Sequence, residues 1–228
     1  MNLKNLNKQY ILFDLDGTIT DSKPGILKSM QYAMKNFGIG IKDEELDSYS
    51  FFLGPPLRDS FRKGFNLNDE EAEKAVAKYR EYFVPKGMFD NILYPGISDL
   101  LKNLKISGKT VILATSKPEI YARQILEHFG LLKYFDFTAG DALDGSRAGK
   151  DKAILRGLEH FNIISSEEKA KAVMIGDRNH DIIGAAKTGI ESVGVLYGYG
   201  SEEELTSGEY RADYIVRDIT ELSELLIL

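Results

Sequence analysis

The sequence predicts an α/β protein, a doubly wound parallel sheet with an all-helical domain inserted after its first strand. Short apolar runs alternate with helical patterns along most of the 228 residues, as in a parallel sheet that helices cover on both faces. The segment 21–91 breaks this alternation and contains helical patterns only. A chain of this length can form one sizeable domain with an insert.

The predicted strands are short apolar runs, and amphipathic patterns between and after them predict the helices of the sheet domain. The strands are expected at 10–13, 110–114, 135–138, 172–175, 192–195 and 214–216. The helices are expected at 97–105, 118–129, 151–161, 181–187, 202–205 and about 219–226.

The helical segment 21–91 is predicted to be a separate domain, and 1–20 together with 92–228 would form the sheet domain. Its apolar positions at helical spacing are Leu27, Met30, Met34 and Phe37 in one pattern and Ala72, Val76, Tyr79 and Phe83 in another. Turn-forming residues at 18–24 and 87–96 predict hinges, so the insert would act as a lid.

Composition excludes several classes of function. The net charge is −6 and no basic block is present, which argues against a nucleic-acid polymer as partner. The chain has no cysteine, so disulfides and thiolate sites are excluded. A polar start without a signal-peptide pattern, and no apolar run near the roughly 18 residues of a membrane span, predict a cytoplasmic protein. The sequence favours no particular oligomeric state.

Asp14 and Asp16 directly follow the first predicted strand. Doubly wound sheets bind their ligands beyond the carboxyl ends of the strands, so a site is expected here. Two neighbouring carboxylates repel and raise each other's pKa unless a cation lies between them. Mg²⁺ prefers oxygen ligands and would serve as this cation. The pair therefore predicts a metal, a carboxylate nucleophile and a second carboxylate that can transfer a proton.

Polar residues also follow the strand predicted at 110–114. Thr115 and Ser116 offer hydroxyl and backbone N–H groups that could hold an anionic oxygen. Lys117 comes next and could reach a leaving group or point into solvent.

Three more charged residues stand near predicted strand or helix ends. Asp177 and Asp181 follow the strand at 172–175, and their spacing puts both on one face if a helix begins there. Considered alone, Asp177 is more simply a helix cap, and Lys150 a surface residue between a turn and a helix. The segment 197–200, Tyr-Gly-Tyr-Gly, is expected to be a loop beside the site, either mobile or a lead-in to the next helix.

Taken together, these groups resemble the motifs of the haloacid dehalogenase superfamily of phosphatases. Residues 14–18 (Asp-Leu-Asp-Gly-Thr) resemble the first motif, Thr115 the second, Lys150 the third and 176–181 the fourth. The resemblance covers the whole chain and implies a haloacid dehalogenase-like core, with the insert matching the small-cap subclass. Local likenesses point to the branch of phosphoglycolate phosphatases and 5'-nucleotidase-like enzymes. They lie at 21–25, 54–58, 198–201 and 212–216.

The resemblance implies a role for each motif residue. Asp14 would be the nucleophile that forms an aspartyl-phosphate, and Asp16 the acid and base. Mg²⁺ would bind the Asp14 carboxylate, the Asp16 backbone carbonyl and Asp177. Asp181 would not bind the metal itself but would orient a water molecule bound to it.

Phosphate oxygens would be bound by Thr115 and Lys150, the latter held by Asp181. The substrate would be a small phosphorylated metabolite, a nucleoside 5'-monophosphate or phosphoglycolate, bound also by Ser116, Lys117 and Arg58. Tyr49, Phe51 and Phe52 could stack on a base, but aromatic residues beside a turn more often form a domain core.

Two alternatives stay open at this point. A phosphomutase of the β-phosphoglucomutase type would use the same residues but keep its phosphoenzyme shielded from water. A non-catalytic phospho-acceptor or binding module would also use acids, a hydroxyl and a lysine around Mg²⁺. Such a module would not require Asp16, whose presence favours a phosphatase or a mutase.

Overall fold

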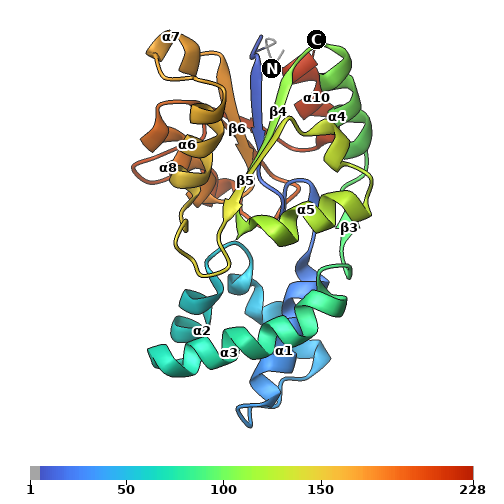
Figure 1. The fold of residues 1–228 in the computed structure, drawn as a ribbon, viewed down its shortest axis with the longest axis vertical. Coiled ribbons are helices and arrows are strands. Elements are labelled where there is room, and N and C mark those ends of the chain that lie inside the picture. The colour runs from blue at the N-terminus through green and yellow to red at the C-terminus, as the bar shows by residue number, and fades with distance from the viewer. Residues whose placement is uncertain (1–5, 228) are drawn as a thin grey trace. The chain divides into compact units, whose positions relative to one another are not determined.

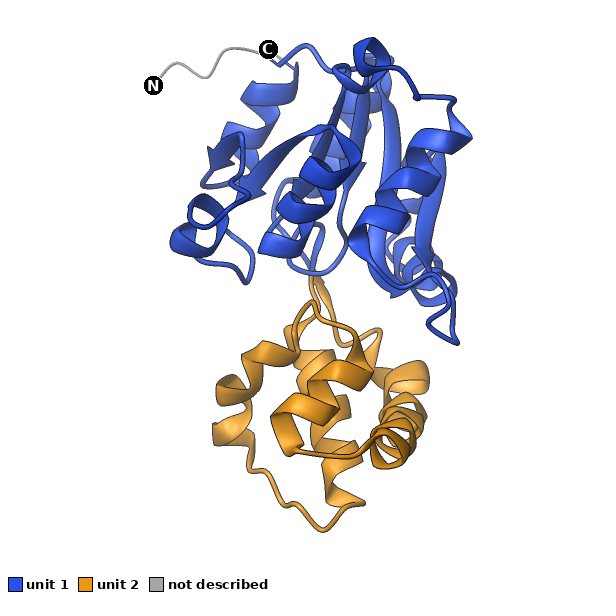
Figure 2. Ribbon diagram, turned by 90° about the vertical axis from the view of Figure 1, so that its left-hand side faces the viewer, with its two compact units in different colours: residues 1–20, 93–228 blue, residues 21–92 orange. Residues whose placement is uncertain are grey.

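The computed structural model describes residues 6–227. The chain divides into two compact units, shown in Figure 2: unit 1 contains residues 1–20 and 93–228, and unit 2 contains 21–92. Each unit is described by itself. Two short paired strands, β2 (Thr20–Asp21) and β3 (Ile92–Leu93), lie where the chain passes between the units.

Unit 1 contains a six-stranded sheet in the order β5-β4-β1-β6-β7-β8, with all neighbouring strands parallel (Figure 1). The strands are β1 (Tyr10–Phe13), β4 (Thr110–Pro118), β5 (Phe137–Asp141), β6 (Ala172–Gly176), β7 (Glu191–Val195) and β8 (Tyr214–Val216). The α/β fold predicted from the alternation of elements is thus confirmed.

Helices cover both faces of this sheet (Figure 1). They are α4 (Ile97–Ile106), α5 (Glu119–His128), α6 (Lys150–His160), α7 (Ser166–Lys169), α8 (Asn179–Thr188), α9 (Glu202–Thr206) and α10 (Ile219–Ile227), with a 3₁₀ turn at Leu132–Tyr134. The four-residue helix α7 was not predicted from the sequence. Pro118, predicted to begin a helix, is the last residue of β4 instead.

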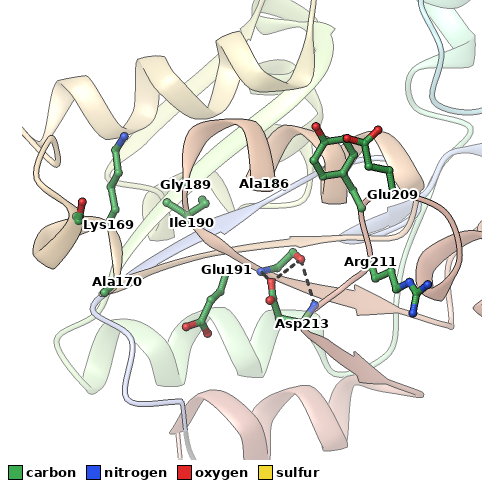
Figure 3. A pocket seen from close by; sticks show the side chains of 12 residues that line it. Lys169, Ala170, Ala186, Gly189, Ile190, Glu191, Glu209, Arg211 and Asp213 are labelled. Carbon is green, nitrogen blue, oxygen red and sulfur yellow. Dashed lines mark hydrogen bonds between the residues drawn. The ribbon is translucent and has the colours of Figure 1, made fainter.

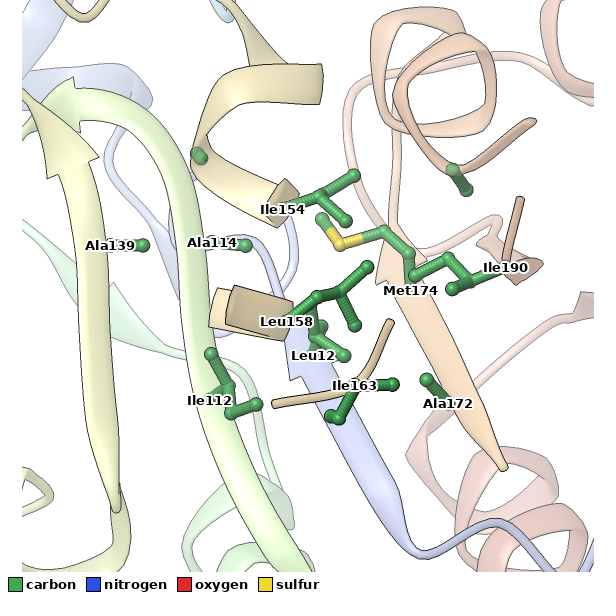
Figure 4. Close-up of a cluster of buried hydrophobic side chains, with 12 residues drawn as sticks. Leu12, Ile112, Ala114, Ala139, Ile154, Leu158, Ile163, Ala172, Met174 and Ile190 are labelled. Carbon is green, nitrogen blue, oxygen red and sulfur yellow. The ribbon is translucent and has the colours of Figure 1, made fainter. Parts of the chain in front are cut away.

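The core between the sheet and α6 is shown in Figure 4. Leu12, Ile112 and Met174 contribute from the sheet, and Ile154 and Leu158 from α6; all are almost fully buried. The alternate residues of the same strands are also buried, because a second layer of helices covers the other face. Continuous apolar runs were therefore the correct strand signal in this sheet.

Unit 2 is helical. It consists of α1 (Lys23–Lys35), a 3₁₀ segment η1 (Asp43–Phe52), α2 (Leu57–Phe65), α3 (Asp69–Tyr82) and a π-helical turn η2 (Phe83–Gly87). Asn68 caps α3 by accepting a hydrogen bond from the Glu71 backbone N–H.

Among the described residues of both units, no helix is both long and apolar enough to cross a membrane.

Candidate active site

The carboxyl ends of β1, β4 and β6 bring Asp14, Thr115 and Asp177 to one edge of the sheet. Phe13 is in register with both Leu113 and Ile175. Asp14, one residue beyond β1, therefore lies close to the ends of β4 and β6, where Thr115 and Asp177 are. The Asp14 backbone N–H donates to the carbonyl of Ile175 at 2.9 Å. The side chains of Asp14, Asp177 and Asp181 are buried, which is costly for charged groups unless each has a partner.

Lys150 supplies that partner for two carboxylates. Its Nζ lies 2.7 Å from Oδ1 of Asp14 and 2.8 Å from Oδ1 of Asp181, and it donates to the carbonyl of Ala114 at 3.2 Å. Burial lowers the pKa of Lys150, but the two carboxylates outweigh this effect and raise it above the ordinary value. Lys150 is therefore an ammonium ion at neutral pH, and it compensates the charge of the predicted nucleophile.

A bulge at the end of β4 exposes the second group of predicted residues to the site. Ala114 pairs with Ala139 and Pro118 with Asp141, so three residues of β4 lie opposite a single residue of β5. Thr115 and Ser116 lie in this bulge, and the Thr115 hydroxyl accepts a hydrogen bond from the Lys117 backbone N–H at 3.2 Å. The sequence predicted that the strand would end at Ala114.

Lys117 contacts the second aspartate of the first motif. Its Nζ lies 2.9 and 2.8 Å from the two carboxylate oxygens of Asp16, and the side chains are only 7% and 14% exposed. Lys117 was predicted to bind substrate. In this structure its ammonium group contacts the carboxylate of Asp16, the residue predicted to act as both acid and base.

Asp177 is fully buried at the end of β6. Its carboxylate accepts hydrogen bonds from the backbone N–H of Tyr199 at 2.7 Å and from the Thr18 hydroxyl at 3.3 Å. Burial raises the pKa of Asp177 well above its ordinary value, and the charges of Asp181 and Asp14 raise it further. The negative charge of an ionised Asp177 carboxylate is thus only partly balanced by other groups of the chain.

This donor set fits a hard divalent cation. Carboxylate oxygens are the ligands Mg²⁺ prefers. A cation beside Asp14 and Asp177 would balance the negative charge of the buried carboxylates that the single Lys150 ammonium does not balance. One ligand atom each from Asp14, His180 and Asp181 also lie within 4.8 Å of one another. The Lys150 ammonium already lies between Asp14 and Asp181, so Asp177 is the better-placed carboxylate for a metal.

His180 is a residue that sequence reasoning left without a role. Burial lowers the pKa of its imidazole, so the ring is neutral at physiological pH. Its Nε2 is buried and makes no hydrogen bond to any residue within 6–227. From the sequence alone, the place of His180 inside the fourth motif, one residue before Asp181, indicates a structural hydrogen bond rather than a chemical role.

The predicted substrate residue of unit 2 lies on α2. The Arg58 side chain is 49% exposed, with Nε 3.1 Å from Glu73 and Nη2 3.6 Å from Asp69. Its role in substrate binding stays a prediction.

The aromatic residues considered for base stacking pack within unit 2. Tyr49 stacks on Phe65 at 5.5 Å between ring centroids, and Phe52, only 1% exposed, meets Phe61 edge-on at 4.9 Å. These contacts favour a role in the core of the domain, although Phe51 is 43% exposed.

A hollow of about 470 Å³ elsewhere on unit 1 is lined by none of the predicted site residues (Figure 3). It lies among α7, the end of α8, the start of β7 and the segment 209–213. The hollow is lined by two basic residues, Lys169 and Arg211, and by two acidic ones, Glu191 and Glu209. The Asp213 carboxylate accepts hydrogen bonds from the backbone N–H and the hydroxyl of Ser192. Nothing there matches the charge pattern of a phosphate site.

Comparisons with known proteins agree on one family. A family model described as haloacid dehalogenase-like hydrolase matches residues 11–195. A 5'-nucleotidase of Pseudomonas aeruginosa is 38% identical over 216 residues, covering 95% of this chain and 94% of that protein. The tyrosine-protein kinase PtkA of Mycobacterium tuberculosis is 37% identical over 212 residues, covering 93% and 67%. A phosphoglycolate phosphatase of Vibrio parahaemolyticus is 28% identical over 223 residues, covering 95% of this chain and 95% of that protein.

A solved structure is similar over nearly its whole length. The crystal structure of a predicted phosphatase from Clostridium acetobutylicum is 46% identical, with a TM-score of 0.88, and the match covers 95% of this chain and 97% of that one.

Proposed function

The chain belongs to the haloacid dehalogenase-like hydrolases and is a phosphatase of that family, and we propose that it is a Mg²⁺-dependent phosphomonoester hydrolase acting on small phosphorylated metabolites. Nucleoside 5'-monophosphates are the substrate class we propose first, and phosphoglycolate second. The higher identity to the 5'-nucleotidase supports this order, as does the sequence at 54–57.

One observation carries the proposal: a buried Lys150 ammonium joins Asp14 to Asp181 at the carboxyl edge of the sheet. A nucleophilic carboxylate must be ionised, yet it must approach an anionic phosphoryl group. The Lys150 ammonium lies 2.7 Å from the Asp14 carboxylate within a buried site and adds positive charge where the phosphoryl oxygens would lie. A purely structural ion pair would not require a third acid, Asp177, buried beside it.

The reaction would proceed in two steps on the protein's own carboxylates. Asp14 attacks phosphorus and forms an aspartyl-phosphate while Asp16 gives a proton to the departing oxygen. Asp16 then takes a proton from the water that attacks this phosphoenzyme, and phosphate is released. Lys117, 2.8 Å from Asp16, fixes the position from which that proton is exchanged.

Mg²⁺ would be held by the Asp14 carboxylate, the Asp16 backbone carbonyl and Asp177. When bound, it supplies positive charge that offsets repulsion between Asp14 and the phosphoryl group. Thr115 and Ser116, in the β4 bulge, would donate hydrogen bonds to the phosphoryl oxygens. In unit 2, Arg58 would recognise the polar leaving group.

The test is phosphate release from nucleoside 5'-monophosphates, phosphoglycolate and sugar phosphates, with and without Mg²⁺. We expect release that chelation abolishes and that Asp14→Asn reduces at least about a thousandfold. Arg58→Ala should raise KM for the best substrate several-fold and leave kcat nearly unchanged, with Lys74→Ala, at an exposed lysine of α3 that pairs with Glu70, as the matched control. Absence of release from every compound would refute the proposal.

Other outcomes of the same assay identify the alternatives. Isomerisation of a sugar phosphate without net phosphate release would indicate a mutase. A stable aspartyl-phosphate without turnover would indicate a phospho-acceptor module. Incubation with ATP and a search for phosphotyrosine would show whether the chain shares the activity named for PtkA.

A further inference from the structure

The loop Tyr197-Gly198-Tyr199-Gly200, called here the Tyr-Gly loop, connects β7 with α9. Its glycines suggest mobility, but in the structure the loop packs tightly around Asp177. We propose that the Tyr-Gly loop is a positioning element for the metal ligand Asp177, holding its carboxylate in the orientation that a divalent cation requires. This inference rests on the function proposed above.

The first evidence is a chain of hydrogen bonds that begins and ends in the loop. The Tyr199 backbone N–H donates to Oδ2 of Asp177 at 2.7 Å, and the Thr18 hydroxyl donates to Oδ1 at 3.3 Å. The Tyr197 hydroxyl in turn donates to the Thr18 carbonyl at 3.1 Å. Because a carboxylate oxygen can accept two bonds, each oxygen of Asp177 keeps a lone pair for a cation. The loop therefore orients the ligand without using up its capacity to coordinate.

The second evidence is the closeness of the two glycines to Asp177. A Cβ on Gly198 would lie 2.3 Å from the Asp177 Cβ and 2.3 Å from the Gly17 carbonyl oxygen. A Cβ on Gly200 would lie 1.9 Å from the Asp177 carbonyl oxygen. Neither residue has the left-handed backbone conformation that favours glycine. Glycine is thus required at both positions by close packing and not by a flexible backbone.

The third evidence is that both ends of the loop are fixed. The Tyr197 ring meets the Tyr94 ring edge-on at 4.9 Å, and the Tyr94 backbone N–H donates to the carbonyl of Ile19 at 3.2 Å. At the other end, Glu204 of α9 contacts Arg178 at 2.8 Å and accepts the Asn179 backbone N–H at 3.0 Å. The segment that carries Asp177 and the segment that carries Thr18 are both tied to the loop.

The experiment measures Mg²⁺ binding directly in two variants of the full chain. Tyr197→Phe removes one hydroxyl, and Gly198→Ala adds the methyl group that Asp177 excludes. Tyr210→Phe and Gly40→Ala are matched controls: Tyr210 lines the hollow that contains no predicted site residue, and a Cβ at Gly40 meets nothing within 4 Å. Calorimetric Mg²⁺ titration and the Mg²⁺-induced rise in Tm are the readouts, together with the Mg²⁺ concentration for half-maximal phosphate release.

We expect Tyr197→Phe to weaken Mg²⁺ binding about tenfold, the lower end of the effect of residues that support metal ligands. KM for the substrate, measured at saturating Mg²⁺, should stay within about twofold of wild type, because the loop acts on the metal ligand alone. Gly198→Ala should weaken Mg²⁺ binding more strongly, and both controls should match wild type.

Two results would each overturn a stated claim. If folded Tyr197→Phe binds Mg²⁺ as tightly as wild type, the loop does not position Asp177 and the inference is wrong while the proposed function stands. If Gly198→Ala does not fold, Tyr197→Phe decides alone. If wild-type protein neither binds Mg²⁺ nor releases phosphate, the proposed function fails and this inference fails with it.

Discussion

Replacing Lys150 by Met should destabilise the metal-free protein by about 3–5 kcal/mol at pH 7.5, the usual effect of removing one partner of a buried ion pair. Lys150, Asp14 and Asp181 have side chains only 2%, 6% and 0% exposed, so water cannot replace the lost ammonium. The folded variant can limit its loss by protonating one carboxyl group. Against the ordinary pKa of 3.8, this costs about 5 kcal/mol at pH 7.5, at about 1.36 kcal/mol per pH unit.

The stability difference between Lys150→Met and wild type should depend on pH. Burial acts to raise the pKa of Asp181, but Lys150 together with the other groups around the carboxylate lowers it, so the wild-type contribution is present above 3.8 and lost only in more acidic solution. In the variant this compensation is gone, and protonation at pH 5.5 costs only about 2 kcal/mol. The difference between the two proteins should therefore shrink by about half between pH 7.5 and 5.5.

Urea unfolding followed by circular dichroism, in the presence of a chelator, measures these free energies. Lys102→Met, at an exposed position of α4, is the control and should change stability by less than about 0.5 kcal/mol. The double variant Lys150→Met/Asp181→Asn should be more stable than Lys150→Met by at least about 1 kcal/mol. A loss below about 1 kcal/mol at pH 7.5, or one that does not decrease at pH 5.5, would refute the reasoning.

Two further predictions concern the predicted metal ligand. Asp177→Asn should make the metal-free protein more stable by about 1 kcal/mol at pH 7.5 and abolish the rise in Tm on adding Mg²⁺, which thermal unfolding with and without the metal would measure. Its advantage should grow as the pH rises above the ordinary pKa of 3.8, because burial raises the folded-state pKa and ionisation then costs folding free energy. Gly17→Ala should cost about 2 kcal/mol more than Gly108→Ala in urea unfolding. Both residues have positive φ, +80° and +72°, but a Cβ on Gly17 would lie 2.1 Å from the Asp177 carboxylate and one on Gly108 meets nothing within 4 Å. Equal losses in the two glycine variants would show that backbone strain alone accounts for them.

Much of the fold could be predicted from the sequence because its central strands are buried on both faces. The run 10–13 coincides with β1, since a strand covered on both faces needs an apolar residue at every position. The edge strand β5 begins two residues later than predicted and ends at Asp141. Its polar and glycine residues carry little strand signal, and a neighbouring strand determines where they pair. The β4 bulge was missed for a similar reason, because Thr-Ser-Lys-Pro reads as a loop.

For the candidate site, residue types and spacing predicted which side chains meet at the edge of the sheet, but not what each one contacts. Lys117 illustrates the limit: its place after Thr115 suggested a substrate contact, and the contact with Asp16, 101 residues away, depends on the pairing of β1 with β4. The Tyr199 N–H that holds Asp177 could not be predicted at all, because every residue except proline carries a backbone N–H group.

The glycines of the site show why a local reading of the sequence reaches this limit. Glycine permits unusual backbone conformations, and it also permits another part of the chain to come unusually close. Gly198 and Gly200 serve the second purpose alone, and the group that approaches them, Asp177, is more than 20 residues away along the chain. Only the folded structure distinguishes the two uses. A Tyr-Gly-Tyr-Gly segment that suggests either a mobile loop or a helix lead-in is consequently packed against Asp177, and this close packing is what we propose orients the predicted metal ligand.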